Sequence, residues 1–482
     1  MNFNACSRRS FCRCLAGSAA ALAVPASLTA GASNAKPWNF VFILVDDLGW
    51  SDLACYGADL HETPHIDRFA SQCTRFSDAY AASPVCTPTR ASIMTGKHPA
   101  RLHMTVWRED TLRPPNRNRK LITPSCVSDL PHDEFTIAEA MRASGRQTAH
   151  IGKWHLGGAS HYPETQGFDV NIGGTHWGAP NSFFYPYRGD EYYGEYRYVP
   201  RLEFGEPGEY LTDRLTNEAL NVMEKMKDDS FFLQLAFHTV HSPIEGKPEL
   251  VEYYQKKIKE GMHHQNATYA AMVHSLDENV GRVLEKIDSL GIADRTVVFL
   301  FSDNGGVASK IRGQSVTDNH PLRSGKGSLY EGGVREPLMV RWPGVTQAGA
   351  VCREPVCSID FYSTMLEIAG IAGDANQNKS MDGISFASLL KNPGARLNRE
   401  ALYWHYPHYY PTTTPVSAIR QGNWKLLKYY EDGHLELYNL QDDQSEANDL
   451  VQKNPGKTAA LHAQLQNWLQ QVDAQLPTPS SP

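Results

Sequence analysis

A single cysteine in residues 83–96 stands where an enzyme would place a nucleophile. Pro88 suits the first turn of a helix, where its missing N–H costs nothing, and Gly96 suits the C-cap. Cys86 therefore lies beside the free N–H groups of a helix N-terminus, which bind anions and lower the pKa of a thiol. Arg90 adds positive charge one turn later. The segment indicates a reactive residue, although a buried structural cysteine has the same local pattern.

Two continuous apolar segments each end in oxygen ligands. Residues 38–45 and 296–301 are rich in β-branched and aromatic residues, which is typical of strands buried on both faces of a parallel sheet. Functional groups gather at the carboxyl ends of such strands. An all-oxygen set favours a hard cation such as Ca²⁺ or Mg²⁺ over zinc. The candidate ligands are Asp46, Asp47, Asp303 and Asn304.

Two further predicted strands end in basic or imidazole side chains. Residues 147–151 lead to Lys153 and His155, and residues 231–237 lead to His241. Taken one at a time, such residues are usually structural. Parallel strands, however, bring their carboxyl ends to one edge of the sheet, so we expect these side chains to lie near the acidic groups.

Helical segments alternate with these strands. Amphipathic patterns predict helices over residues 136–145, 211–227 and 270–290. Such an alternation of β and α units argues for a large, mostly parallel sheet with helices on both faces.

The chain changes character from about residue 396. Short segments within 401–440 are typical of antiparallel strands, and residues 457–471 are predicted to form a helix. The sequence therefore predicts an α/β chain in three parts: an export signal at 1–35, a catalytic domain at 36–395 and a smaller α+β domain with an antiparallel sheet at 396–482.

Residues 1–35 carry the features of a twin-arginine export signal. Arg8 and Arg9 precede a modest apolar stretch at 15–24, and the residues up to Ala35 suit a cleavage site. The apolar stretch is too short to span a bilayer. We therefore expect the twin-arginine machinery to export the protein to the periplasm or the exterior of a bacterium, without a stable membrane anchor.

The overall charge indicates no general attraction for polyanionic partners. The chain has 482 residues and a net charge of −7, so it has no general attraction for nucleic acid or anionic membranes. An anionic substrate would need local positive charge. Six cysteines remain after removal of the signal, without zinc-site spacing, and whether Cys352 and Cys357 form a disulfide stays open.

Three segments are candidates for contact with a substrate. Residues 175–200 mix aromatic residues, among them Trp177, with Gly, Asn and Arg, and suit either sugar stacking or a cover over the core. The segment that begins at His405 is similarly aromatic. The glycine density of residues 320–335 implies tight turns that present Lys326 inward.

The motifs together resemble those of the type I sulfatases of the alkaline phosphatase superfamily. Cys-x-Pro-x-Arg runs from Cys86 to Arg90 and is followed by Thr-Gly at 95–96, with Thr89 where serine is commoner. The block Gly-Lys-Gly-x-x-Tyr-Glu-Gly-Gly-x-Arg surrounds Lys326. The resemblance extends in family order from residue 38 to about 450.

This resemblance implies a sulfuric ester hydrolase whose nucleophile is the hydrate of formylglycine made from Cys86. It implies a maturation enzyme, either formylglycine-generating or radical-based. It also implies calcium, in preference to magnesium, held by the four oxygen ligands together with residue 86. The substrate would be an organic sulfate, and we expect a sulfated sugar at the end of a glycan, with Trp177 and His405 contributing to its binding.

The resemblance also implies individual roles. Asp303 would accept a proton from the nucleophile. His241, together with Lys326, would protonate the leaving oxygen as general acid, and His155 would take the proton that releases sulfate. The sulfate oxygens, or the formylglycine itself, would be held by three basic residues: Lys153, Lys326 and Arg90.

Three other functions fit parts of the sequence. A phosphonate monoester or phosphodiester hydrolase of the same superfamily would use the same scaffold. A sulfated-glycan-binding protein without catalysis would keep the fold. A thiol hydrolase would use unmodified Cys86 with His241.

Overall fold

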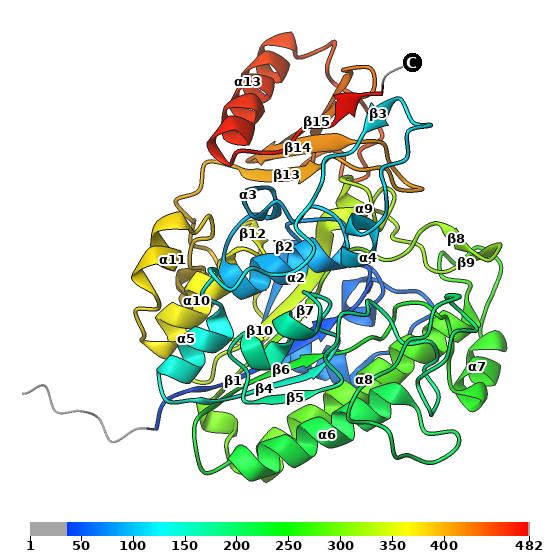
Figure 1. Cartoon of the computed structure of the whole chain (residues 1–482), viewed down its shortest axis with the longest axis vertical. Helices are drawn as coiled ribbons and strands as arrows, with labels where there is room; N and C mark the ends of the chain where they lie inside the picture. The colour runs from blue at the N-terminus through cyan, green and yellow to red at the C-terminus, as the bar shows by residue number, and fades with distance from the viewer. Residues whose placement is uncertain (1–35, 481–482) are drawn as a thin grey trace, which may run out of the picture. The chain divides into compact units, whose positions relative to one another are not determined.

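The computed structural model describes residues 36–480 (Figure 1). The predicted export signal at 1–35 lies outside the described residues. Contacts from Pro37 onward group into one compact unit. This unit contains a large nine-stranded sheet and, near the C-terminus, a smaller four-stranded sheet. No helix within residues 36–480 is long and apolar enough to cross a membrane.

The large sheet has nine strands in the order β11-β2-β10-β7-β1-β6-β4-β5, with β12 also paired to β2. Only β10 runs antiparallel to its neighbours, which confirms the mostly parallel sheet. The strands are β1 Asn39–Val45, β2 Thr74–Tyr80, β4 Gln147–Gly152, β5 Val170–Ile172, β6 Phe231–Ala236, β7 Thr296–Ser302, β10 Arg335–Arg341, β11 Val351–Cys352 and β12 Val356–Cys357.

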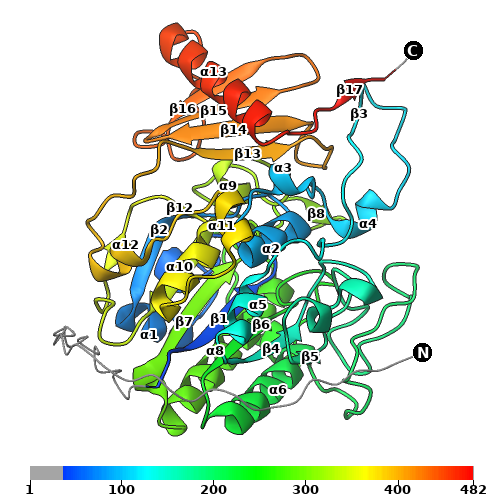
Figure 2. The ribbon, with the colours of Figure 1, turned by 60° about the vertical axis from the view of Figure 1, so that its left-hand side comes forward.

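Helices cover both faces of this sheet (Figure 2). Alternate side chains of β1 point in opposite directions, so Val41 and Ile43 enter one core and Phe40 and Phe42 enter the other. The first core includes α1 Pro64–Gln72, α6 Leu211–Met226 and α8 Ala267–Ser289. The second includes α2 Cys86–Thr95, α5 Ile137–Ala143, α10 Asp360–Ala369 and α12 Ala387–Lys391.

The predicted helices agree with the structure to within a few residues at each end. The aromatic segment 175–200 contains no helix, as its irregular pattern indicates. The remaining short elements are α3 Pro99–Leu102, α4 Arg108–Thr111, α7 Pro248–Gln255, α9 Glu331–Val334, α11 Ala375–Ser380, β3 Leu121–Ile122, β8 Lys310–Ile311, β9 Gln314–Ser315 and β17 Thr478–Pro479.

The C-terminal region forms the predicted antiparallel sheet. One face packs on helix α13, through Leu461 and Leu465, and the other packs near Tyr80 and Val85. The smaller sheet thereby supports the start of α2. The predicted boundary at residue 396 stays a prediction. The elements are β13 Leu402–Tyr406, β14 Val416–Gln421, β15 Trp424–Tyr429, β16 Leu435–Asn439 and α13 Pro455–Gln471.

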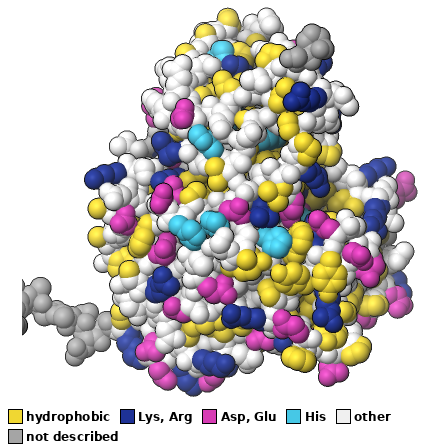
Figure 3. All heavy atoms as spheres, viewed as in Figure 1, with side chains coloured by type: hydrophobic (Ala, Val, Ile, Leu, Met, Phe, Trp, Pro, Cys, Tyr) yellow, Lys and Arg dark blue, Asp and Glu magenta, His cyan; other side chains and the backbone are white. Residues whose placement is uncertain are grey.

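The six cysteines of the described residues are all free thiols, so Cys352 and Cys357 are not joined. On the face shown in Figure 3, acidic and basic side chains are interspersed. This mixed surface fits the modest net charge of −7.

Candidate active site

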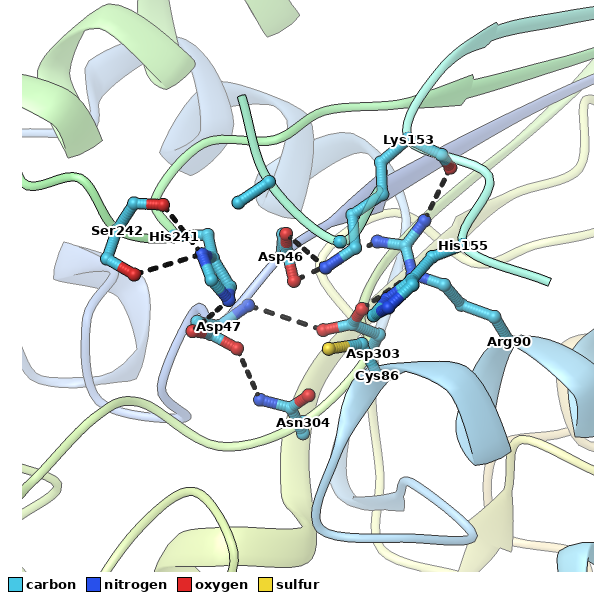
Figure 4. Close-up of polar contacts among 12 residues, drawn as sticks. Asp46, Asp47, Cys86, Arg90, Lys153, His155, His241, Ser242, Asp303 and Asn304 are labelled. Atoms are coloured by element: carbon cyan, nitrogen blue, oxygen red, sulfur yellow. Dashed lines mark hydrogen bonds and ion pairs between the residues drawn. The ribbon is translucent and has the colours of Figure 1, made fainter. Parts of the chain in front are cut away.

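The polar residues that follow the central strands meet at one edge of the large sheet. Strands β7, β1, β6 and β4 are neighbours in that order and run parallel, so their carboxyl ends open on the same side. Figure 4 shows how the side chains converge there. They are Asp303 and Asn304 after β7, Asp46 and Asp47 after β1, His241 after β6, and Lys153 and His155 after β4.

Three buried carboxylates form the centre of this site. One oxygen from each of Asp46, Asp47 and Asp303 lies within 4.8 Å of the others. Asn304 Nδ2 donates a hydrogen bond to Asp47 Oδ1 at 2.7 Å. Asn304 Oδ1 and Asp46 Oδ1 are buried without a hydrogen-bond partner among the described residues. Buried oxygens of this kind are costly unless a ligand satisfies them, so the four residues fit a hard divalent cation.

Each of these carboxylates pairs with one buried basic side chain. The arrangement fixes three positive groups around the cation position before any ligand binds, so an anion would meet them without reorganisation. Arg90 is further held by a hydrogen bond from its Nη1 to the Lys153 carbonyl at 2.7 Å. The ion pairs are Lys153 Nζ–Asp46 Oδ2 at 2.7 Å, Arg90 Nε–Asp303 Oδ2 at 2.8 Å and Lys326 Nζ–Asp47 Oδ1 at 2.7 Å.

Cys86 is the first residue of α2 and is buried, with its Sγ 4.0 Å from Lys326 Nζ. Burial raises the pKa of the Cys86 thiol to about 11, although Lys153 and Lys326 oppose the change. The prediction of a lowered thiol pKa is therefore wrong, because desolvation outweighs the charges of the two lysines. An unmodified Cys86 stays protonated at neutral pH, which counts against the thiol hydrolase.

His155 is oriented by Glu109, a residue of the short helix α4. His155 Nε2 lies 2.6 Å from Glu109 Oε2, and Glu109 Oε1 accepts a hydrogen bond from the Gly178 N–H at 3.0 Å. His155 Nδ1 is buried without a hydrogen-bond partner among the described residues. Burial lowers the pKa of His155 to about 4, against the opposing charge of Glu109. The imidazole is therefore neutral near pH 7 and able to accept a proton.

His241 lies on the other side of the carboxylates. Its Nε2 is 3.6 Å from Asp47 Oδ2, and its Nδ1 is 2.8 Å from the Ser242 carbonyl. Burial, followed by the charge of Lys326, holds the pKa of His241 well below its usual value, although Asp47 acts in the opposite direction. An anion bound beside it would raise that pKa again.

A cavity of about 280 Å³ opens over this centre. Its volume lies near the lower end of the range for small-molecule sites. Cys86, His155, His241 and Lys326 line it, so nucleophile position, candidate base, candidate acid and a basic group face the same space. The charged and aromatic side chains of its wall are Glu109, Arg113, Arg197, Trp107, Tyr193 and Tyr410.

Comparison with known proteins identifies the family. A sulfatase family profile matches residues 38–371, and a profile described as N-sulphoglucosamine sulphohydrolase, C-terminal, matches residues 324–475. The chain belongs to the sulfatase family. It is thus a hydrolase of sulfate esters.

Individual relatives of this sulfatase agree over most of its length. A sulfatase of Formosa agariphila is 32% identical over 91% of this chain and 89% of its own. Human N-acetylgalactosamine-6-sulfatase is 31% identical, with coverages of 81% and 75%. The crystal structure of Ps i-CgsB in complex with k-i-k-neocarrahexaose has a TM-score of 0.74 and 29% identity, with coverages of 90% and 93%.

Two predicted substrate contacts of the sulfatase lie outside the cavity wall. His405 is buried, with Nδ1 2.7 Å from Ser417 Oγ and Nε2 2.9 Å from the Gln475 carbonyl. Both nitrogens are engaged within the C-terminal region, so the substrate-binding prediction for His405 is wrong. Trp177 lies behind Arg197, whose guanidinium carbon is 5.1 Å from its ring centroid, and Arg197 is the residue that faces the cavity.

Sequence reasoning missed Glu109, and it included Arg197 and Tyr410 only as members of the aromatic segments 175–200 and 405–410. Glu109 belongs to a four-residue helix without a recognisable pattern, and its function depends on a contact with His155, 46 positions away. Tyr410 lies in the aromatic segment that drew attention to His405 instead. Glu109 could have been found from the sequence only by asking which carboxylate can pair with His155.

Proposed function

We propose that this sulfatase removes sulfate from a sulfated carbohydrate, with formylglycine made from Cys86 as the nucleophile and calcium as the resident cation. The observation that carries the proposal is the position of Cys86. It stands at the start of α2, faces the cavity, and lies 4.0 Å from a lysine that is itself paired with Asp47. When present, formylglycine supplies a hydrated aldehyde as nucleophile, and calcium supplies charge neutralisation.

Asp46, Asp47, Asp303 and Asn304 would hold the cation. Their support is the all-oxygen donor set and the two buried oxygens that no other group in the described residues satisfies. Magnesium demands a more regular octahedral shell and retains more water, so we favour calcium at a site this buried.

The basic groups would bind and orient the sulfate. Lys326 Nζ lies close to Cys86 and faces the cavity, where it can hold a sulfate oxygen next to the reacting position. Lys153 is fully buried on Asp46 and would add charge from the other side. Both are fixed in advance, which favours charge that develops on the oxygens in the transition state.

His241 and His155 would move protons in opposite directions. The bound anionic ester raises the pKa of His241, so its Nε2 can carry a proton to the leaving oxygen. His155 donates its Nε2–H to Glu109, which leaves the lone pair of its Nδ1 free to accept a proton. Glu109 thereby fixes the tautomer of the base.

The cavity wall supports a sugar as the rest of the substrate. Trp107, Tyr193 and Tyr410 provide aromatic faces, and Arg113, Arg197 and Glu109 provide hydrogen-bonding groups. The volume of about 280 Å³ favours one terminal sugar over a buried stretch of polymer. The names of two relatives, N-acetylgalactosamine-6-sulfatase and the enzyme crystallised with k-i-k-neocarrahexaose, point to the same class.

Export and maturation complete the proposal. The twin-arginine pathway carries folded proteins, so a maturation enzyme would act on Cys86 in the cytoplasm before the protein reaches the periplasm or the exterior.

The test is sulfate release from a panel of sulfated mono- and oligosaccharides, measured by ion chromatography. Aryl sulfate and matched phosphate esters serve as controls. We expect turnover of at least one sulfated sugar with kcat/KM well above that for its phosphate analogue. Turnover of aryl sulfate alone would contradict the carbohydrate proposal, and preference for phosphate esters would favour the phosphonate or phosphodiester hydrolase.

A further inference from the structure

A second polar cluster lies beside the catalytic centre and takes no part in the proposed reaction. It consists of Asp52, His61 and His264, all of them buried. One carboxylate oxygen of Asp52 and one nitrogen of each imidazole lie within 4.8 Å of one another. The rings of His61 and His264 lie at a centroid distance of 4.3 Å and are tilted by 52° to each other. These three residues are called here the Asp52 cluster; Asp52 and His61 are close in the chain, whereas His264 lies more than 200 positions further on.

His264 has the arrangement of a metal ligand. Its Nδ1 lies 2.8 Å from Asp59 Oδ1, and the Asp59 carboxylate also accepts hydrogen bonds from the backbone N–H groups of His263 and His264. A carboxylate on one imidazole nitrogen is the usual partner of a histidine that binds metal through the other. His264 Nε2 is buried and faces Asp52 Oδ1 at 3.3 Å, a contact that is an ion pair when the imidazole is protonated.

His61 is held in a similar way. Its Nδ1 lies 2.8 Å from the Asp52 carbonyl, so that nitrogen carries the proton and the lone pair of the neutral ring is on Nε2. Both histidines therefore have one nitrogen fixed by an oxygen acceptor.

Asp52 connects the cluster to the turn that carries the catalytic carboxylates. Its Oδ2 accepts hydrogen bonds from the Gly49 N–H at 2.7 Å and from the Tyr269 hydroxyl at 2.6 Å. The same hydroxyl lies 3.3 Å from the Asp47 carbonyl. Asp52 Oδ1 accepts a hydrogen bond from the Thr317 hydroxyl. Whatever fixes Asp52 also fixes the turn after β1.

We propose that Asp52, His61 and His264 form a second metal site, for a structural divalent transition metal of the zinc type. Two imidazoles and one carboxylate suit zinc, whereas calcium takes oxygen ligands. Zinc bonds of 2.0–2.1 Å in a tetrahedral shell place ligand atoms about 3.3 Å apart, and Asp52 Oδ1 and His264 Nε2 have that separation. A fourth ligand would come from solvent. A cavity of about 640 Å³ lies nearby and is lined in part by Thr317 and His263, which adjoin Asp52 and His264.

The competing occupant is a proton. Burial lowers the pKa of His264, but hydrogen bonds and charge from Asp52 and Asp59 outweigh it and raise the pKa to about 9. Without metal, His264 is therefore an imidazolium between two carboxylates. Metal binding replaces the Nε2 proton and releases it to solvent, so the charge of the cluster rises by one when a divalent ion binds.

The experiment is zinc reconstitution of the full chain. Protein stripped with a chelator is loaded with excess calcium, then with zinc, dialysed, and analysed for metal content by mass spectrometry. We expect one zinc per wild-type chain, and none in His61→Gln or His264→Gln. The matched control His263→Gln changes the neighbouring, half-exposed histidine and should keep its zinc. Asp303→Asn and Cys86→Ser, which alter the catalytic centre, should keep it as well.

A variant outside the three ligands tests the proposal if substitution of a buried histidine prevents folding. Asp59→Asn leaves all three ligands in place and alters only the partner of His264 Nδ1. Loss of such a partner typically weakens metal affinity by about 10- to 100-fold, which competition with a zinc indicator would measure. Wild-type protein without zinc, zinc content unchanged in both histidine variants, or unchanged zinc affinity in Asp59→Asn would overturn the proposal.

Discussion

Two polar clusters flank the turn that follows β1, and they differ in their donor atoms and in their neighbours. The catalytic cluster has three carboxylates and an amide, each carboxylate paired with a lysine or an arginine. The Asp52 cluster has two imidazoles and one carboxylate, and the groups bonded to them are oxygen acceptors, hydroxyls and a backbone N–H. The first is built to hold a hard cation and receive an anion. The second contains no lysine or arginine, and none of its three residues lines the cavity of about 280 Å³.

The largest expected difference is in kcat/KM, between variants of Cys86 and variants of His264. Cys86→Ala removes the atom from which the nucleophile is made, and should lower kcat/KM for the sulfated substrate by at least about 10³-fold. His264→Gln touches no group in the cavity, and should lower kcat/KM by less than about tenfold. Steady-state kinetics on the two purified variants, with folding checked by circular dichroism, makes the comparison. Equal losses of kcat/KM in both variants would contradict a catalytic role for Cys86 and a structural role for His264.

The next largest difference is expected in how the two clusters respond to metal chelators. Removal of calcium by a calcium-selective chelator should lower kcat by about 10²-fold or more, because the cation stabilises charge in the transition state. Calcium should restore the activity. A zinc-selective chelator should instead lower the melting temperature by a few degrees with little change in kcat. Reversal of these two patterns would mean that the metals have been assigned to the wrong clusters.

The sequence predicted the catalytic cluster far better than the Asp52 cluster, and the reason is local pattern. Asp46, Asp47, Asp303 and Asn304 each follow a long apolar run, and parallel pairing of such strands fixes their meeting point. His61 and His264 follow no strand, and they meet only because α8 packs against α1. The sequence around His61 and around His264 has no pattern that predicts this contact.

Two failures at the catalytic centre have similar physical causes. The lowered pKa predicted for Cys86 ignored burial, which the sequence does not display and which outweighs the charges of Lys153 and Lys326. His405 shares its aromatic surroundings with Tyr410, but strand β13 turns His405 toward Ser417 and away from the cavity. Composition indicates an aromatic segment, whereas only the register of the sheet tells which of its side chains is accessible.

A smaller effect is expected at Glu109, which contacts His155, the proposed base. Glu109→Gln should lower kcat by about 10- to 100-fold with a smaller change in KM, because His155 loses its fixed orientation. The negative charge of Glu109 raises the pKa of His155, which burial holds at about 4. The acid limb of the pH–kcat profile should therefore move to lower pH in the variant. An unmoved limb would show that His155 is not the group that titrates.

The smallest expected effect concerns stability in alkali. In metal-free protein the folded pKa of His264 is about 9, above its unfolded value of about 6.5. Its stabilising contribution is thus complete below pH 6.5 and is lost as the pH rises through 9. Between pH 7 and pH 10 the melting temperature of metal-free wild type should fall by about 1–3 °C more than that of His264→Gln. A parallel decline in the two proteins would argue that His264 is not ion-paired.

The central claim, that Cys86 becomes the nucleophile of a sulfatase, is tested most directly by mass spectrometry. The tryptic peptide 76–90 should be taken from protein made in its native host. The account predicts an aldehyde in place of the Cys86 thiol in most of the peptide. A fully unmodified thiol that reacts with iodoacetamide in the active, purified enzyme would contradict it.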